Sequence, residues 1–348
     1  MNCTIVVGGQ YGSEGKGKVV ALCAARARNP WVVRCGGPNS GHTVGIGGRE
    51  VVLRQVPAGA AHPDALLLIS AGCVVDEDLL LKEMDDLGLP PERVVIDPRA
   101  VLVTADDQAS EQRLVAQIGS TASGTGAALV RRMMRSEDVP LVGGSARLKA
   151  RARVETVAPL VHDHLDRGDD VIVEGTQGFG LSLLHSPVYP YATSRDTTAS
   201  GFAMEVGLSP RDVTSIVMVI RTFPIRVGGN SGRLQDEITW EDVQASSRAP
   251  EVMPEYTSVT KRLRRVGRFD LEMVKMACRY NKPTSLAVMG LDRLDYLNTG
   301  VGAALDLTES GKAFIRSVER ETKTSVEWVG TGFRTEQSIR LENGVDCG

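Results

Sequence analysis

The stretch that determines the fold spans residues 4–18 and reads TIVVGGQYGSEGKGK. Its apolar, β-branched start predicts a short buried strand, and the residues from Lys16 onward predict a helix. Between them, the segment from Gly8 to Lys18 holds five glycines and two lysines. A glycine-rich turn from strand to helix exposes backbone N–H groups where a phosphate is favoured, and Lys16 or Lys18 can add positive charge. The sequence therefore predicts an anion-binding loop.

This loop differs from the two common phosphate-binding motifs. When it is aligned on the Walker A pattern, Gln10 stands at the first glycine and Gly17 at the magnesium-binding serine or threonine. The dinucleotide-binding pattern G-x-G-x-x-G does not match either. We interpret the segment as a loop that resembles a P-loop in its place after the first strand but not in its sequence.

The rest of the chain alternates between strand and helix patterns. Short apolar runs predict buried, largely parallel strands at 31–33, 66–69, 94–96, 171–173, 216–220 and 285–288. Helical patterns cover 16–28, 77–87, 106–118, 146–165, 270–280 and 310–321. This alternation predicts an α/β fold with a largely parallel central sheet and helices on both faces. We expect one domain over 1–348, with functional insertions at the long loops 36–48, 119–126, 175–201 and 226–235.

Composition excludes several classes of protein. The chain has 348 residues, of which 42% are hydrophobic and 24% charged, with a net charge of -3, so it is neither disordered nor fibrous. A near-neutral charge argues against nucleic acid or an anionic membrane as a partner. Six scattered cysteines without a CxxC pair predict reduced thiols, and neither a signal peptide nor a membrane span is expected. We expect a cytoplasmic protein.

A second glycine-rich segment, CGGPNSGHT at 35–43, adds to a resemblance to a known family. Together the two segments closely resemble the adenylosuccinate synthetase signatures GxQWGDEGKGK and GGxNAGHT. Four further segments match in family order: VEGTQG at 173–178, YPYATSRDTTASG at 189–201, TKRLRR at 260–265 and GTGFRTE at 330–336. The resemblance covers essentially the whole chain.

The resemblance implies a ligase that replaces the 6-oxo group of a purine nucleotide by the amine of aspartate. A γ-phosphoryl group is first transferred to the oxygen, and aspartate then displaces phosphate. Such a transfer depends on positioning and charge neutralisation. The implied partners are a purine nucleoside monophosphate, a nucleoside triphosphate and L-aspartate, and the implied cofactor is Mg²⁺.

The resemblance also implies roles for the two glycine-rich segments. Lys16 would contact the transferring phosphoryl group, and His42 would stabilise its charge as a hydrogen-bond donor or general acid. Mg²⁺ would be ligated at Gly41 and Ser13. The residues expected to bind the donor nucleotide from these segments are Gly12, Glu14, Gly15, Lys16, Gly17, Lys18, Gly41, His42 and Thr43.

The purine and aspartate sites are implied in the same way. Gln177 would orient the 6-oxo region, and the 5′-phosphate would be bound by Asn39, Ser120, Thr121 and Thr193. Arg135 matches an arginine that the family contributes from the neighbouring subunit of a homodimer, although a solvated basic helix end is an alternative. The segment expected to receive aspartate contains Val259, Thr260, Arg262 and Arg264, whose alternative is a solvated charged face.

Ser13 is the first departure from the family pattern. Ordinary members carry there an aspartate that acts as base at purine N1 and ligates magnesium, and a serine hydroxyl is too weak to replace it as a base at neutral pH. Serine leaves space near purine C2 and can accept a hydrogen bond from a 2-amino group. A branch of the family with viral members carries serine here and acts on dGMP, and this chain resembles that branch. Its compartment would then be the host cytoplasm.

The second departure lies at VMGLD, residues 288–292. Ordinary members read TKLD, with a lysine on the guanine of GTP and an aspartate bound to its N1 and N2 hydrogens. Gly290 replaces that lysine while Asp292 remains, so ATP or dATP becomes the expected donor. Gly330 and Gly332 would close over the base, with Phe333 as a stacking surface.

Two other functions remain open at this point. One is an ordinary adenylosuccinate synthetase that uses IMP, GTP and aspartate and tolerates Ser13. The other is a non-catalytic nucleotide-binding descendant of the enzyme. Retention of Lys16, His42, Gln177 and the arginine-rich segment 260–265 argues against the second, because a simple nucleotide-binding protein needs no aspartate site.

Overall fold

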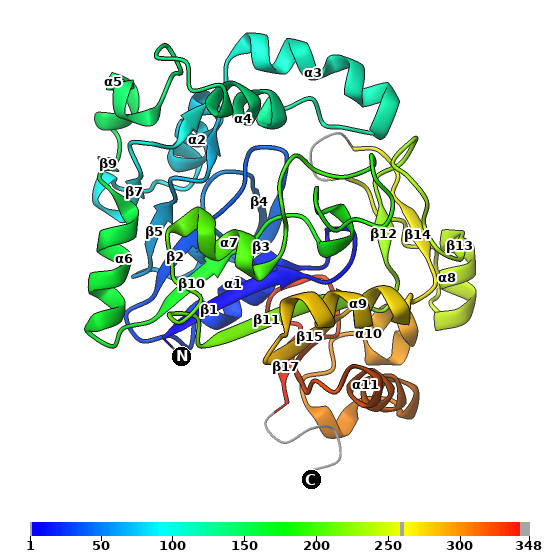
Figure 1. Cartoon of the computed structure of the whole chain (residues 1–348). Coiled ribbons are helices and arrows are strands. Elements are labelled where there is room, and N and C mark those ends of the chain that lie inside the picture. Colours follow the sequence, from blue (N-terminus) through cyan, green and yellow to red (C-terminus); the bar gives the residue numbers. More distant parts are fainter. Residues whose placement is uncertain (1, 258–260, 342–348) are drawn as a thin grey trace.

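The computed structural model describes residues 2–257 and 261–341, and its centre is a ten-stranded sheet (Figure 1). In order across the sheet, the strands are β17 (Ser338–Arg340), β16 (Val326–Gly330), β15 (Ser285–Met289), β11 (Ser215–Arg221), β1 (Cys3–Gly8), β10 (Val171–Glu174), β2 (Trp31–Arg34), β5 (Leu66–Ile69), β7 (Val94–Ile96) and β9 (Arg153–Val154). Neighbouring strands pair in parallel, except for β17, which is antiparallel to β16 at one edge. The predicted largely parallel sheet is confirmed.

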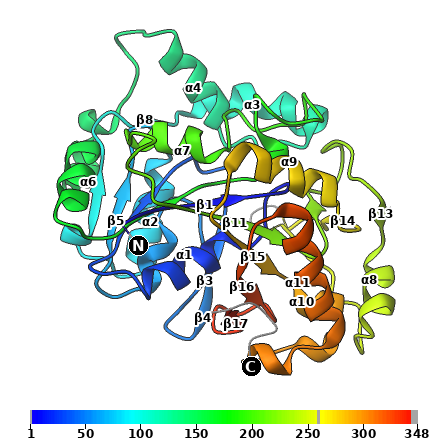
Figure 2. The ribbon, with the colours of Figure 1, turned by 60° about the horizontal axis from the view of Figure 1, so that its bottom comes forward.

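Side chains along β1 alternate between two apolar cores, as a strand covered on both faces requires. Ile5 and Val7 belong to one core and Val6 to the other. The first core includes residues of α6 (Val157–Asp166), α7 (Ala199–Val206), α9 (Leu271–Asn281) and α11 (Glu309–Thr322), and the second includes residues of α1 (Lys16–Ala24) and α2 (Glu77–Asp86). Figure 2 shows α7 and α9 on one side of β1 and α1 on the other. The predicted cover of helices on both faces is confirmed.

The predicted helix over 146–165 is wrong. The structure has α5 (Ala146–Lys149), then β9 at the edge of the sheet, and α6 only from Val157. Pro159 explains the break, because its ring and missing N–H are tolerated in the first turn of a helix but not in its interior. It therefore stands near the start of α6, after the chain has joined the sheet.

Outside the central sheet the chain forms several small elements that the apolar runs did not predict. The hairpin of β3 (His42–Ile46) and β4 (Arg49–Leu53) lies within or just after the first predicted long loop, 36–48. A three-stranded sheet contains, in order, β12 (Ile225–Arg226), β14 (Arg265–Gly267) and β13 (Glu237–Ile238). A two-stranded sheet pairs β6 (Val74–Val75) with β8 (Val101–Leu102). The remaining helices are α3 (Ala105–Ile118), α4 (Thr125–Met133), α8 (Trp240–Ser247) and α10 (Leu291–Leu294). Short 3-10 turns lie at Ala58–Ala61, Pro91–Arg93, Val142–Gly144, Phe179–Leu181, Tyr296–Asn298 and Ala304–Asp306.

Two further sequence expectations concern the cysteines and the membrane. Cys3, Cys23, Cys35, Cys73 and Cys278 are buried free thiols, and Cys347 lies outside the described residues. Burial raises the pKa of the Cys23 thiol to about 12. Among the helices of the described ranges, none is long and apolar enough to span a membrane.

Candidate active site

The first loop has the strand-to-helix geometry that the sequence predicts. After β1 the backbone turns through left-handed conformations, with φ of +86° at Gly12, +58° at Ser13 and +102° at Gly15. Gly15 is also the N-cap of α1, and no side chain caps this helix end. The first N–H groups of the helix therefore point into the loop, where an anion would be favoured by the helix dipole.

Glu14 shapes this loop from the inside. Its side chain is buried, and its carboxylate accepts hydrogen bonds from the backbone N–H groups of Gly12 at 2.7 Å and Gln10 at 3.2 Å. The same carboxylate accepts from the Lys16 ammonium at 2.5 Å. Glu14 was expected among the residues that bind the donor nucleotide. Its contacts make it a residue that holds the loop and places Lys16.

Lys18 was expected to bind the donor nucleotide, and in the structure it contacts the C-terminal segment. Its ammonium donates to the carbonyl of Gly332 at 3.0 Å and to that of Gln337 at 2.9 Å. Burial lowers the pKa of Lys18 to about 8, and the negative charge of Asp292 opposes this shift. Lys18 thus links the first turn of α1 to the C-terminal segment that was expected to close over the donor base.

His42 lies against the first turn of α1. Gly17 makes this approach possible, because a Cβ there would stand 2.8 Å from the Cβ of His42. The Nδ1 atom of His42 contacts the carboxylate of Glu174, while its Nε2 atom is buried and has no hydrogen-bond partner in the described residues. Burial, and after it the charge of Arg34, lowers the pKa of His42 to about 4, although Glu174 opposes the shift. The ring is therefore neutral at neutral pH, with its proton on Nδ1.

This protonation state differs from the expected donor role of His42. A neutral ring that donates from Nδ1 to a carboxylate offers only an acceptor at Nε2. Donation to a phosphate oxygen would need a second proton on the ring.

Some of the residues predicted to bind the purine nucleotide lie together. The amide of Asn39 donates to the hydroxyl of Thr193 at 3.3 Å, although the two segments are far apart in sequence. Gln177 directs its amide toward the phosphate loop, since a Cβ on Gly12 would lie 3.8 Å from the amide oxygen of Gln177. Gln177 itself has a φ of +64° just beyond the end of β10.

Ser120 and Thr121 make local contacts in the turn between α3 and α4. The hydroxyl of Ser120 accepts from the N–H of Ala122 at 3.1 Å, and the hydroxyl of Thr121 donates to that of Ser123 at 3.2 Å. These bonds order the turn. They do not by themselves join it to Asn39 and Thr193.

The segment predicted to bind aspartate is anchored by two residues that the sequence analysis missed. Glu255 accepts from Arg264 at 3.3 Å and from Arg221 at 3.1 Å. Arg221 also donates to the carbonyl of Ser13 at 3.1 Å. The network therefore connects the aspartate segment to the phosphate loop. Arg262 is exposed, and Val259 and Thr260 lie outside the described residues.

The expected base site of the donor lies around α10. Gly290 is the N-cap of this helix with a φ of +84°, a conformation that favours glycine over lysine. Burial raises the pKa of Asp292. Phe333 is 71% exposed and is available as a stacking surface.

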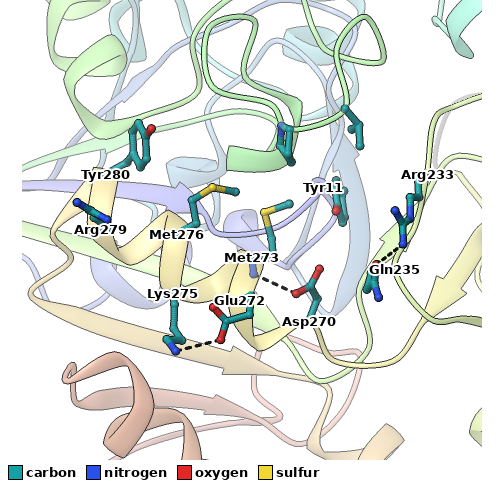
Figure 3. Close-up of a pocket in the computed structure, with 12 residues that line it drawn as sticks. Tyr11, Arg233, Gln235, Asp270, Glu272, Met273, Lys275, Met276, Arg279 and Tyr280 are labelled. Atoms are coloured by element: carbon teal, nitrogen blue, oxygen red, sulfur yellow. Dashed lines mark hydrogen bonds and ion pairs between the residues drawn. The ribbon is translucent and has the colours of Figure 1, made fainter.

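Tyr11, in the first loop, is one of the residues that line a separate pocket. The pocket has a volume of about 1250 Å³, and Figure 3 shows Met273 and Met276 of α9 at its centre and Arg233 with Gln235 at one side. Of the predicted site residues that the structure describes, none lines it. The guanidinium of Arg226 lies 4.5 Å from the centre of the Tyr11 ring. This pocket is therefore distinct from the site built around the phosphate loop.

Comparison with known proteins identifies the family. The sequence model for adenylosuccinate synthetase matches residues 5–139 and 144–301. The chain belongs to the adenylosuccinate synthetase family. It is accordingly a carbon–nitrogen ligase of purine nucleotide biosynthesis.

Two archaeal adenylosuccinate synthetases are similar over nearly their whole length. The protein of Methanocaldococcus jannaschii is 38% identical over 354 residues, which cover 99% of this chain and 98% of that protein. The protein of Archaeoglobus fulgidus is 37% identical over 350 residues, which cover 98% of each.

Two solved structures share the fold. Fully ligated adenylosuccinate synthetase from Plasmodium falciparum has a TM-score of 0.87 at 18% identity, over 98% of this chain and 100% of that chain. The succinoaminodeoxyadenylate synthetase of cyanophage S-2L, described as bound to dGMP and to dATP as an energy donor, has a TM-score of 0.81. It is 28% identical, over 97% of this chain and 95% of that chain.

Mg²⁺ is the cofactor generally used by the adenylosuccinate synthetase family, and the oxygens at its expected place are the Gly41 carbonyl and the Ser13 hydroxyl. The described residues hold no group of three or more histidine, cysteine, aspartate or glutamate side chains suited to a metal ion. Mg²⁺ usually keeps several waters and is held by one or two protein ligands together with substrate phosphates. The Ser13 hydroxyl, exposed in the phosphate loop, and the Gly41 carbonyl, which precedes His42, are oxygens of the kind that such an ion takes.

Proposed function

We propose that this ligase joins L-aspartate to C6 of dGMP, with ATP or dATP as the phosphoryl donor and Mg²⁺ as the cofactor. The observation that carries the choice of purine is Ser13. It lies exposed in the phosphate loop, next to the Gly12 position that the Gln177 amide approaches. The product is the 2-amino analogue of deoxyadenylosuccinate, a precursor of a diaminopurine nucleotide.

The reaction proceeds in two steps, a phosphoryl transfer and a displacement by aspartate. The γ-phosphoryl group passes to the purine O6, and the nucleoside diphosphate leaves. The aspartate nitrogen then bonds to C6, the C6–O bond breaks, and inorganic phosphate leaves. Lys16 and the N–H groups at the start of α1 neutralise the transferring charge, and Gln177 orients the 6-oxo region. The proton once taken by the family's aspartate goes to the bound substrate aspartate or to a phosphate oxygen.

The choice of dGMP rests on the size and charge of the residue at position 13. A serine hydroxyl is neutral and small, so it leaves room at purine C2 and accepts a hydrogen bond from a 2-amino group. The cyanophage structure described with dGMP and dATP supports the same substrates at 28% identity.

The second candidate is the ordinary reaction of IMP, aspartate and GTP. Relatives named adenylosuccinate synthetase reach 39% identity, against 28% for the cyanophage protein, so sequence similarity favours this candidate more than the first. Ser13 is the observation against it, because a hydroxyl cannot act as the base that IMP chemistry uses at neutral pH.

One assay separates the two candidates. The purified protein is given dGMP, GMP or IMP in combination with ATP, dATP or GTP, in the presence of aspartate and Mg²⁺, and product formation is measured. The highest kcat/KM is expected with dGMP and an adenine nucleotide. If IMP with GTP is the best pair, the chain is an ordinary adenylosuccinate synthetase.

ATP or dATP is expected to exceed GTP as the donor by about 10- to 100-fold in kcat/KM, which corresponds to a few kcal/mol of lost base contact. Gly290 supplies no long side chain to lie on guanine. The Asp292 carboxylate can instead accept from an adenine amino group. Donor kinetics at saturating dGMP and aspartate test this, and equal kcat/KM for GTP and ATP would contradict it.

The active unit is proposed to be a homodimer in which Arg135 binds the purine phosphate of the partner subunit. Arg135 is exposed and follows α4, where Val130, Met133 and Met134 are 61%, 68% and 71% exposed. Exposed apolar side chains gathered on one helix are typical of an interaction surface.

Subunit mixing tests this arrangement. Arg135→Ala and Lys16→Ala chains are each expected to be nearly inactive, because one lacks the phosphate contact and the other the loop lysine. Mixed dimers contain one site with both residues intact, so activity should return to a fraction of wild type. Formation of the mixed dimer without any rescue would contradict a shared site; the Arg113→Ala chain serves as a control for loss of an exposed arginine elsewhere.

A further inference from the structure

Glu174 is a buried carboxylate with no role in the two reaction steps described above. It is the last residue of β10, and its exposed fraction is 0%. Burying a charge in this way is costly unless donors surround it. One oxygen accepts from Arg34 at 2.6 Å and from Nδ1 of His42, and the other accepts from the N–H of Ala58 at 2.7 Å.

Arg34 fixes Glu174 from the neighbouring strand. It ends β2, and its Cα is in register with that of Glu174 across the parallel pair of β2 and β10. Its second nitrogen donates to the carbonyl of Ser40 at 3.0 Å. The same guanidinium therefore holds both the carboxylate and the segment that leads to His42. A side chain held by two strand ends and a backbone N–H has little freedom to move.

The other ring nitrogen of His42, Nε2, is not used in hydrogen bonds with the described residues. Nε2 is buried and has no hydrogen-bond partner in the described residues, although buried polar atoms are normally paired. Gly17, beside which His42 packs, belongs to the first turn of α1. The Cβ of His42 is thus placed against the helix end where the transferring phosphoryl group is expected.

We propose that Glu174 is a positioning residue, which holds the first proton of His42 on Nδ1 and fixes the ring, so that a second proton taken up at Nε2 can be donated to the transferring phosphoryl group. Arg34 and the N–H of Ala58 hold the carboxylate in place for this purpose. Carboxylates that orient a histidine in this way set which ring nitrogen carries the proton. The inference rests on the proposed phosphoryl transfer, but the tautomer can be measured without any turnover.

The first test is two-bond ¹H–¹⁵N NMR on protein labelled at its histidines. The signals of His42 are assigned by their loss in His42→Asn. Wild type is expected to show the Nδ1-protonated form, and Glu174→Gln is expected to lose that preference, because an amide can donate as well as accept. An Nε2-protonated His42 in wild type would overturn the proposal, even if Glu174→Gln fails to fold and even if no purine is ligated.

The second test is kinetic. Glu174→Gln should lower kcat by about 10- to 100-fold, the usual effect of a residue that acts through another, while KM for the purine nucleotide and for aspartate stays within about threefold. In the His42→Asn background the same change should have little further effect, because the ring it orients is gone. An equal loss in both backgrounds would overturn the proposal.

Glu205→Gln is the matched control. Glu205 is also a largely buried glutamate that accepts from an arginine, Arg195 at 2.9 Å, and from a backbone N–H, that of Gly36 at 3.1 Å. It contacts no histidine among the described residues. The control reports the cost of removing such a carboxylate, and it should leave the tautomer of His42 unchanged. A change of tautomer in both variants would show a general loosening of the fold and would overturn the specific role of Glu174.

Discussion

Ser13→Asp is expected to lower kcat/KM for dGMP by an amount that corresponds to about 1 to 3 kcal/mol of transition-state stabilisation. The kcat/KM for IMP should stay unchanged or rise. The carboxylate would crowd the space assigned to the purine 2-amino group and would restore the base that IMP chemistry uses. The backbone should accept the change, because φ at this position is +58° and aspartate visits left-handed conformations more readily than most residues. Steady-state kinetics with both nucleotides at saturating donor and aspartate measure the effect.

Ser13→Asn is the control for size without charge. It should lose activity on dGMP to a similar extent but gain nothing on IMP, because an amide is no base. A site that hydrogen-bonds a substituent discriminates strongly against the analogue that lacks it, so wild type should favour dGMP from the outset. If wild type converts IMP at least as well as dGMP, or if Ser13→Asp lowers both equally, the 2-amino group does not lie at Ser13.

The central sheet could be predicted because its strands are covered on both faces. Segments such as 171–173 and 216–220 are then continuous apolar runs, which stand out in a sequence without any partner being known. The edge strand β9 was harder to predict from the sequence. β9 has only two residues, and Arg153 is exposed, so nothing in its composition marks a strand. Its place depends on pairing with β7, which is a tertiary contact.

The candidate site likewise has a part that the sequence could predict and a part that depends on tertiary contacts. The phosphate loop could be predicted because its chemistry is local, with glycines, lysines and the helix start all within 8–18. Arg34 and Glu174 stand 140 residues apart and meet only because β2 and β10 are neighbours. Glu174 falls in a matched segment, so its position was available, but its role required the contacts. Arg221, like Arg34, follows a predicted strand at its carboxyl end, where polar residues of parallel sheets gather.

Glu255 offers a test of the network that joins the aspartate segment to the phosphate loop. Its carboxylate contacts two arginines, Arg221 and Arg264, and Arg221 reaches the Ser13 carbonyl. Although burial alone would raise it, the pKa of Glu255 is lowered from 4.5 to about 2, chiefly by the charge of Arg221 and its hydrogen bond. A carboxyl group whose pKa is lower in the folded state stabilises the fold above its unfolded pKa, and this contribution is lost as the pH falls toward the folded pKa.

Glu255→Gln is therefore expected to reduce the free energy of unfolding by about 3 kcal/mol at pH 7, because each pKa unit corresponds to 1.36 kcal/mol and two arginines lose their partner. The difference from wild type should stay constant down to about pH 5 and shrink steadily between about pH 4.5 and pH 2, as wild type becomes protonated. Urea denaturation at several pH values measures it, with exposed Glu92→Gln as the control that should change little at any pH. KM for aspartate should also rise more than KM for the purine nucleotide, because Arg264 loses the carboxylate that places it. A difference that does not depend on pH would mean that Glu255 stabilises the fold through packing rather than through its charge.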